Sequence, residues 1–286
     1  MARVTILLGK GGTGRTTIGR ALALNLAEER STALLHTQPS TQVPDERVHN
    51  LSVQVLDPEA LLHEQVQSLV PLGPLTRMVT GHPAFESFLE IAPGIKEAAV
   101  LNHLYDFLAR RNDRVVVDGP ATGHGLHFLQ APRKLERVTT GKVSQRLADV
   151  DDMLTDPEHT EIVLVALPEE LPARETMELA DNLQREGFPV SGVILNRMPP
   201  PIPFDVGKLG PRPKPSPRSS TRAGDGPTVG SIGPEDALSL LAAEREEAER
   251  WLDELESREV PCRVVPSLPG RPDLAEEVST FVEGFP

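Results

Sequence analysis

The feature that most constrains the fold of this chain is a glycine-rich segment, GKGGTGRTT, at residues 9–17. It directly follows the apolar run Val4–Leu8 and leads into a stretch with strongly amphipathic spacing over Thr16–Arg30. This order predicts a buried strand, a tight turn and a helix whose first N–H groups point at the turn. Such a turn is suited to bind an anion such as a phosphate.

Two motifs overlap in this segment, and the first is the dinucleotide fingerprint. Gly9, Gly11 and Gly14 match the pattern G-x-G-x-x-G. A dinucleotide site also needs an Asp or Glu about 20 residues further on, at the end of the second strand, to bind the ribose hydroxyls. The sequence there reads HTQP, at residues 36–39, and has no acid. We therefore keep the dinucleotide fold as the less favoured alternative.

The second motif is a P-loop. Residues 9–16 match G-x-x-x-x-G-[K/R]-[S/T], with Arg15 in the position usually held by lysine. A P-loop needs a hydroxyl beside the basic residue to hold Mg²⁺, and Thr16 supplies one. It also needs an acid at the end of a later strand, and Asp118 follows the apolar run Val115–Val117. The sequence thus favours a nucleotide site with Mg²⁺ at Thr16 and Asp118.

Apolar runs alternate with helical spacing along the rest of the chain, which is typical of a parallel sheet joined by crossover helices. The predicted strands are Val4–Leu8, Ala33–His36, Val53–Leu56, Val115–Val117, Ile162–Ala166, Val190–Leu195 and Arg263–Val265. The predicted helices are Thr16–Arg30, Pro58–Leu69, Ile95–Arg110, Leu171–Glu186 and Pro234–Glu259. The expected fold class is α/β, a three-layer P-loop NTPase with a mostly parallel central sheet and a small helical insertion.

A single domain, residues 1–286, suits a chain of this length. Within it we expect helical insertions at about 60–112 and 126–160, near the edge of the sheet where ligands bind in such folds. Residues 131–160 are expected to form short helices. A proline-rich loop is expected at 199–233, because nine of the 28 prolines lie there and proline supplies no N–H to a helix or central strand.

Charge and cysteine content limit the partners. The net charge of −13 argues against constitutive binding of nucleic acid or an anionic membrane, since both need clustered Lys and Arg. The N-terminus becomes glycine-rich too soon for a signal peptide, and no apolar run is long enough to span a membrane, so we expect a cytoplasmic protein. The single cysteine, Cys262, excludes an intrachain disulfide and a cysteine-only zinc site.

Taken together, these motifs resemble the MinD/ParA/ArsA class of P-loop ATPases, which share a deviant Walker A loop, and within it the ArsA branch. That branch comprises the arsenite-pump ATPases and the targeting ATPases for tail-anchored membrane proteins. The matching segments are KGGTGRTT at 10–17 (family KGGxGKTT), residues 50–58 (NLxxxxIDP), residues 92–97 (PGxxE), DGPATGH at 118–124 (DTAPTGH), LPEE at 167–170 and ILNR at 194–197. They cover nearly the whole chain, in order.

The resemblance implies a role for each matching residue. Lys10 would reach the nucleotide of the other subunit across a dimer interface, and Arg15 would take the place of the usual lysine at the β- and γ-phosphates. Thr16 would bind Mg²⁺, and Asp118 would hold its water shell. The implied ATP-binding residues are Gly9, Lys10, Gly11, Gly12, Thr13, Gly14, Arg15, Thr16 and Thr17, with Asn196 at the adenine and Pro266 and Leu268 in a loop over the base.

Two departures from the family bear on hydrolysis. Arg15 is bulkier than lysine and planar, so it can bind phosphate without reproducing the geometry of an ammonium. The family's second strand ends in an Asp that positions the attacking water, and Gln38 stands at or next to that position. A glutamine can orient a water but cannot accept its proton. Lys10, Gln38 and Asp118 are therefore the candidate catalytic residues, with Asp45 as a partial substitute for the missing acid.

Two further departures concern metals. The proline-rich segment stands where the eukaryotic targeting ATPases carry a C-x-x-C zinc pair, and the arsenite enzymes bind metalloid through several cysteines. Cys262 stands alone, so we expect no arsenite binding. His124 and His127 lie three residues apart, but two histidines make an incomplete zinc set, and we expect His124 to serve the switch segment instead.

The resemblance implies an ATP-binding P-loop ATPase that acts as a nucleotide-switched homodimer, binds a protein or apolar client at the helical insertion, and hydrolyses ATP weakly. The alternative is a non-hydrolysing regulatory or structural partner, including one in a heterodimer with an active paralogue. The apolar stripes on the insertion are interpreted as core faces, or alternatively as a client groove: Phe85, Phe88, Leu89 and Ile91, and Leu101, Leu104, Tyr105 and Leu108.

Overall fold

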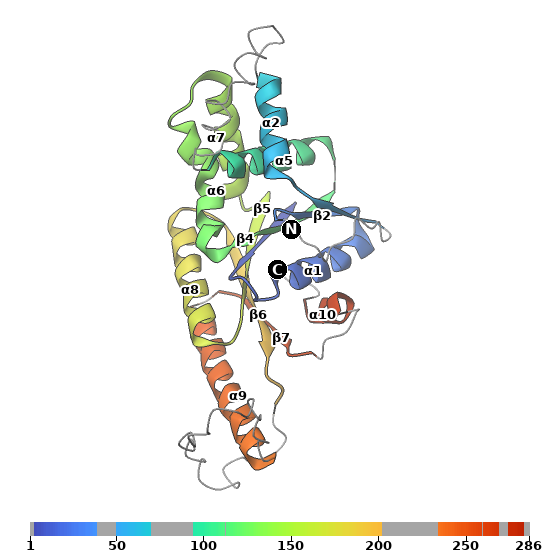
Figure 1. Ribbon diagram of the computed structural model, residues 1–286, viewed down its shortest axis with the longest axis vertical. Helices are drawn as coiled ribbons and strands as arrows, with labels where there is room; N and C mark the ends of the chain where they lie inside the picture. The colour runs from blue at the N-terminus through green and yellow to red at the C-terminus, as the bar shows by residue number, and fades with distance from the viewer. Residues whose placement is uncertain are drawn as a thin grey trace, which may run out of the picture.

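Seven strands form one sheet in the order β3-β2-β4-β1-β5-β6-β7 (Figure 1). The computed structural model describes residues 3–38, 50–69, 94–111, 113–201, 234–258, 260–268 and 274–282. The strands are β1 (Val4–Gly9), β2 (Thr32–His36), β3 (Leu51–Val55), β4 (Arg114–Ala121), β5 (Thr160–Ala166), β6 (Val190–Met198) and β7 (Cys262–Pro266). Each predicted strand is confirmed, and every pairing in the sheet is parallel.

The helices fill the crossovers, as predicted. They are α1 (Arg15–Glu29), α2 (Pro58–Leu69), α5 (Ile95–Arg110), α6 (Thr122–Glu136), α7 (Gly141–Thr155), α8 (Glu170–Arg185), α9 (Pro234–Glu256) and α10 (Leu274–Val282). The prediction of short helices over residues 131–160 is wrong, because α6 and α7 are each 15 residues long. The sequence analysis also missed α10.

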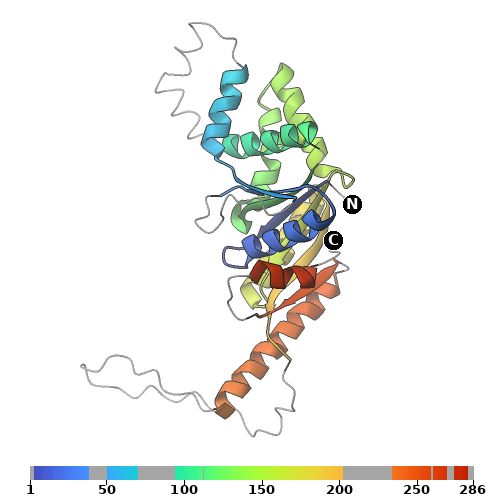
Figure 2. The same ribbon diagram turned by 90° about the vertical axis from the view of Figure 1, so that its right-hand side faces the viewer.

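The sheet has two apolar faces because side chains alternate along each strand. In β1, Val4, Ile6 and Leu8 pack on the face that carries α5 to α9, while Leu7 packs on the opposite face with α1 and α10. Figure 2 shows α1 and α10 lying side by side, as their contacts require. Parallel strands covered on both sides read as continuous apolar runs. The three-layer α/β fold is therefore confirmed.

The surface of α1 differs from the prediction. Its spacing predicted a strongly amphipathic helix, but its buried residues extend around most of its circumference: Ile18, Gly19, Ala21, Leu22, Ala23 and Ala27. The reason is that α1 packs both against the sheet and against α10. A helix enclosed from two sides needs small or apolar side chains on both, so the narrow stripe of a surface helix is lost.

The helices α5, α6 and α7 contribute large side chains to the core. Leu101, Leu104 and Leu108 of α5 are buried against the sheet, so this stripe is a core face. The other stripe, in residues 85–91, lies outside the described residues, as do most of the proline-rich segment and the switch residues 39–49. Within the described ranges, no helix combines the length and apolar character needed to cross a membrane.

The lone cysteine lies at the start of β7. Burial, with a further contribution from the charge of Glu256, raises the pKa of the Cys262 thiol to about 11. The thiol is therefore protonated at neutral pH, whereas the thiolate is the form that binds soft metals. This burial adds a physical reason to the expectation that Cys262 does not bind arsenite.

Candidate functional site

The glycine-rich turn joins the centre of the sheet to the N-terminus of α1. A Cβ at Gly9, the last residue of β1, would lie 2.4 Å from the carbonyl oxygen of Val165 in β5, so only glycine fits there. Gly14 precedes α1 with a φ of 86°, a left-handed conformation that favours glycine, and no side chain caps the helix. An uncapped N-terminus presents N–H groups and a partial positive charge to an anion over the turn.

Thr13 anchors the turn from within. Its Oγ1 donates a hydrogen bond to the carbonyl of Lys10 at 2.9 Å, and its carbonyl accepts one from Nδ2 of Asn196 at 2.7 Å. Gly11 and Gly12 form the exposed top of the turn. Asn196 is buried in β6, so its side-chain amide supports the turn, and its contact with adenine stays a prediction.

The guanidinium of Arg15 points to Asp118. Its Nε donates to Oδ1 of Asp118 at 2.7 Å, and its Nη1 donates to the carbonyls of Gly9 and Pro120, both at 2.8 Å. Only 11% of the Arg15 side chain and 8% of the Asp118 side chain are exposed. Arg15 therefore ties the end of β1 to the end of β4, and its predicted place at the phosphates stays a prediction.

The second carboxylate oxygen of Asp118 is also occupied. Its Oδ2 accepts a hydrogen bond from Oγ1 of Thr16 at 2.7 Å and lies 3.0 Å from Nδ1 of His36. Burial raises the pKa of Asp118, but the hydrogen bond to His36 and the charge of Arg15 outweigh it, so the pKa lies below its ordinary value. Asp118 is a buried carboxylate whose charge is balanced by its neighbours.

Thr16 and Asp118 supply two ligand types that Mg²⁺ prefers, and the magnesium site stays a prediction. A hydroxyl oxygen and a carboxylate oxygen 2.7 Å apart are hard ligands on facing elements. Magnesium in nucleotide sites keeps several waters and is bound through one or two protein ligands and the phosphate oxygens. These two residues would hold the ion, with Arg15 beside it. In the described ranges no group of three or more His, Cys, Asp or Glu side chains could hold a metal, and His124 and His127 belong to no such group.

Lys10 has a partner within its own chain. Its Nζ lies 2.8 Å from Oε1 of Glu175 in α8, and each side chain is 34% exposed. Glu175 was not among the predicted site residues, because nothing in the sequence relates α8 to the turn. Because water reaches both side chains of this part-buried pair, we expect it to contribute little stability and Lys10 to exchange partners readily.

The remaining predicted residues lie near the turn or beside a cavity. Pro266 pairs with Met198 at the end of β6, and Leu268 packs partly buried against the α1 side of the core. Thr17 lies in the first turn of α1. Asp45 lies outside the described residues.

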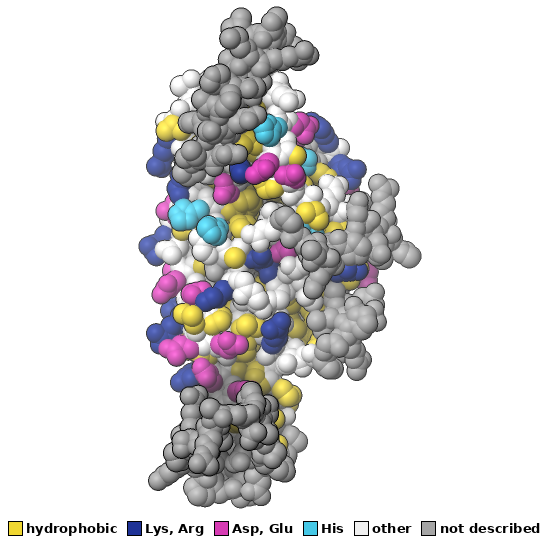
Figure 3. Space-filling view, in the orientation of Figure 1, with side chains coloured by type: hydrophobic (Ala, Val, Ile, Leu, Met, Phe, Trp, Pro, Cys, Tyr) yellow, Lys and Arg dark blue, Asp and Glu magenta, His cyan; other side chains and the backbone are white. Residues whose placement is uncertain are grey.

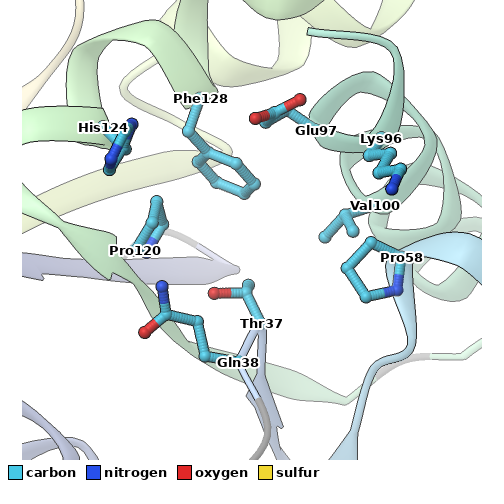
Figure 4. Close-up of a pocket in the computed structure, with 9 residues that line it drawn as sticks. All are labelled: Thr37, Gln38, Pro58, Lys96, Glu97, Val100, Pro120, His124 and Phe128. Carbon is cyan, nitrogen blue, oxygen red and sulfur yellow. The ribbon is translucent and has the colours of Figure 1, made fainter. Parts of the chain in front are cut away.

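The cavity, of about 320 Å³, lies at the ends of β2 and β4 (Figure 4). Gln38 lines it from the end of β2, His124 from α6 and Glu97 from α5. Its other lining residues are Thr37, Pro58, Lys96, Val100, Pro120 and Phe128. The structure therefore brings the two switch candidates, Gln38 and His124, to one space. It adds Glu97, which the sequence analysis recognised only as part of the PGxxE match.

A parallel sheet with this turn, Thr16 and Asp118 defines a P-loop nucleotide-binding protein. The sequence model of the "Anion-transporting ATPase" family, the ArsA ATPases, matches residues 2–145 and 139–205. The chain therefore belongs to the ArsA family of P-loop ATPases.

The chain is also similar to individual proteins whose names fit this family. The chain is 29% identical to "ATPase BagA" of Mycobacterium tuberculosis over 68% of its own length and 65% of that protein. It is 30% identical to an "Arsenical pump-driving ATPase" of Escherichia coli over 67% of its own length and 34% of that protein. It is 28% identical to "ATPase GET3" of Lodderomyces elongisporus over 66% of its own length and 71% of that protein. The matched region is thus slightly less than two thirds of BagA and about one third of the E. coli protein.

We expect Arg15→Met to lower the free energy of unfolding by about 3 kcal/mol, because it leaves the buried Asp118 carboxylate without its cation. Adding Asp118→Asn to this variant should cost less than the sum of the two single substitutions, since both halves of the pair are then uncharged. Urea unfolding of the two single variants and the double variant measures both effects. Arg20→Met, on the same helix, is the control. An Arg15→Met variant as stable as Arg20→Met would contradict the prediction.

Proposed function

We propose that this chain is an ATP-binding switch protein with slow hydrolysis, which uses residues 9–17 for the phosphates and Thr16 and Asp118 for Mg²⁺. The observation that carries the proposal is the contact between Thr16 at the uncapped start of α1 and Asp118 in the C-terminal half of β4. Phosphate-binding turns need this convergence of N–H groups, a hydroxyl and an acid. Membership of the ArsA family supports the proposal.

Each part of the turn has a separate task in nucleotide binding. The N–H groups of the turn and the first turn of α1 bind phosphate oxygens, and the glycines allow the close approach. Lys10 and Arg15 add positive charge. When bound, Mg²⁺ neutralises charge on the β- and γ-phosphates. The chain's own residues orient the nucleotide and exclude water from one side of it.

Slow hydrolysis is proposed because of Gln38. It lines the cavity of Figure 4 together with His124, at the end of β2 where the family has its water-positioning Asp. A glutamine amide can hold a water in place, but it cannot take the proton that the water loses on attack. The chain would therefore bind ATP for long periods, which suits a switch better than a fast enzyme.

A homodimer is proposed from the family resemblance and from Lys10. For Lys10 to reach the nucleotide of a second copy, its ion pair with Glu175 must open. Since both side chains are about one third exposed, this exchange costs little.

An apolar client is proposed from a second cavity, of about 440 Å³, lined by residues of α2, α5, α6 and α7. Most of its lining is aliphatic: Leu62, Val66, Ile95, Ala98, Ala99, Leu135, Val143 and Leu147. Its polar lining residues are Gln65, Asn102, Asp106, Thr139, Lys142 and Arg146. A cavity of this size and character is in the range that holds apolar ligands.

Nucleic acid is not proposed as a partner. On the face shown in Figure 3, Lys and Arg side chains are interspersed with Asp and Glu instead of forming one basic patch. This distribution and the net charge of −13 both oppose binding to phosphate backbones.

The second candidate function is a non-hydrolysing partner in a heterodimer with an active paralogue. The engagement of Arg15 with Asp118 favours it, because both groups would need to serve the nucleotide during hydrolysis. Binding of ATP without any phosphate release would support this candidate.

The first function test is the Gln38→Asp variant. We expect the wild type to bind ATP and release phosphate slowly, and Gln38→Asp to raise the rate about tenfold, which is about 1.4 kcal/mol of barrier, because an acid then receives the proton. A phosphate-release assay measures it. Gln145→Asp, on the exposed side of α7, is the matched control and should leave the rate unchanged. Wild-type turnover of about a few per second would contradict the proposal.

The homodimer is tested through Lys10 and Glu175. We expect ATP, but not ADP, to shift the wild type from monomer to dimer. Lys10→Ala should abolish the shift, and Glu175→Gln should increase the dimer fraction by releasing Lys10. Size-exclusion chromatography with light scattering measures the mass, and Glu178→Gln on the same helix is the control. A wild type that is monomeric with both nucleotides would remove the cross-subunit role of Lys10.

The client cavity is tested by placing a charge in its wall. We expect Val143→Asp to weaken binding of an apolar helical peptide of about 20 residues by about tenfold, because the carboxylate would line the cavity that takes apolar side chains of the peptide. Fluorescence titration with a labelled leucine-rich peptide measures the affinity. Val138→Asp, at a side chain that is 78% exposed, is the control. Equal affinities for the two variants would place the peptide elsewhere.

A further inference from the structure

The side chain of Arg15 is held in a way that limits its movement. Its three hydrogen bonds go to Asp118, Gly9 and Pro120, and two of these acceptors are backbone carbonyls at the ends of central strands. The guanidinium is planar, so its donors keep a fixed geometry relative to one another. A single acceptor such as a phosphate oxygen would have to replace all three contacts to draw it away.

Both carboxylate oxygens of Asp118, in turn, already contact neighbours of this chain. Arg15 occupies Oδ1, and Thr16 and His36 lie at Oδ2. The guanidinium cannot lose its proton in a protein, so it is a permanent positive charge at this carboxylate. A divalent cation would be attracted most strongly beside the Asp118 carboxylate. The guanidinium of Arg15 already lies there.

We propose that Arg15 is a built-in counter-cation for Asp118, and that Mg²⁺ at Thr16 and Asp118 therefore adds little to the affinity of this chain for its nucleotide. The inference rests on the proposed nucleotide binding at residues 9–17. A divalent ion at Thr16 and Asp118 gains less binding free energy here than in a P-loop with lysine. The carboxylate is already neutralised, and the guanidinium repels a second cation beside it.

Lysine at position 15 should behave differently. An ammonium is a compact charge on a flexible stem, and it cannot present the fork that spans Asp118 and two carbonyls together. It can follow the phosphates of a bound nucleotide and leave Asp118 to the metal ion. Arg15→Lys is therefore expected to restore the dependence on Mg²⁺.

The experiment is calorimetric titration of the full chain with ADP, in Mg²⁺ and in EDTA. ADP is used because its binding does not require turnover. We expect wild-type affinities in the two solutions to agree within about threefold, and Arg15→Lys to bind at least about tenfold more tightly with Mg²⁺ than without it. Arg20→Lys, on α1, is the control and should behave as the wild type.

The outcomes separate the two proposals. A wild type that binds ADP tenfold or more tightly with Mg²⁺ would overturn the role of Arg15 and leave the proposed function intact. No binding in either solution would overturn both. If Arg15→Lys fails to fold, as circular dichroism would show, the wild-type ratio alone decides.

Discussion

The carboxylate of Asp118 is the group on which the arrangement of the site depends. Parallel register places it opposite His36 of β2 and Leu7 of β1, so three central strands meet around it. A buried carboxylate is stable only if its neighbours balance its charge. Arg15, Thr16 and His36 provide that balance, and they come from two different parts of the chain. The need to satisfy one acid thus fixes the relative positions of the turn, α1 and two strand ends.

Much of this site could be predicted from the sequence because its parts are local. The turn after β1, the hydroxyl of Thr16 and the acid at the end of the Val115–Val117 run all follow from short motifs. Parallel strands end at the same edge of a sheet, so the two motifs had to meet. The apolar runs predicted all seven strands, because most of these runs are short and rich in Val, Ile and Leu and alternate with longer helical stretches.

The contacts that could not be predicted join segments far apart in the chain. Arg15 looked like a phosphate ligand, and only the folded structure shows its guanidinium at Asp118. Lys10 meets Glu175 across 165 positions, and no spacing rule covers that distance. The position of His36 at a strand end was visible in the sequence, but its burial and its contact with Asp118 were not. The breadth of the apolar surface of α1 was missed for a similar reason, since α10 was unknown.

The position of α5 has a mechanical consequence. Its first two turns carry Glu97 and Val100 into the cavity beside Gln38, and Ile95, Ala98 and Ala99 into the aliphatic cavity that α2, α6 and α7 also line. The helix α5 therefore separates two cavities. One lies at the ends of the central strands, and the other lies away from them. If the helix moves as a rigid body toward one cavity, it leaves more space in the other. A displacement of α5 toward one cavity therefore enlarges the other, with no need for a longer chain of contacts to connect them.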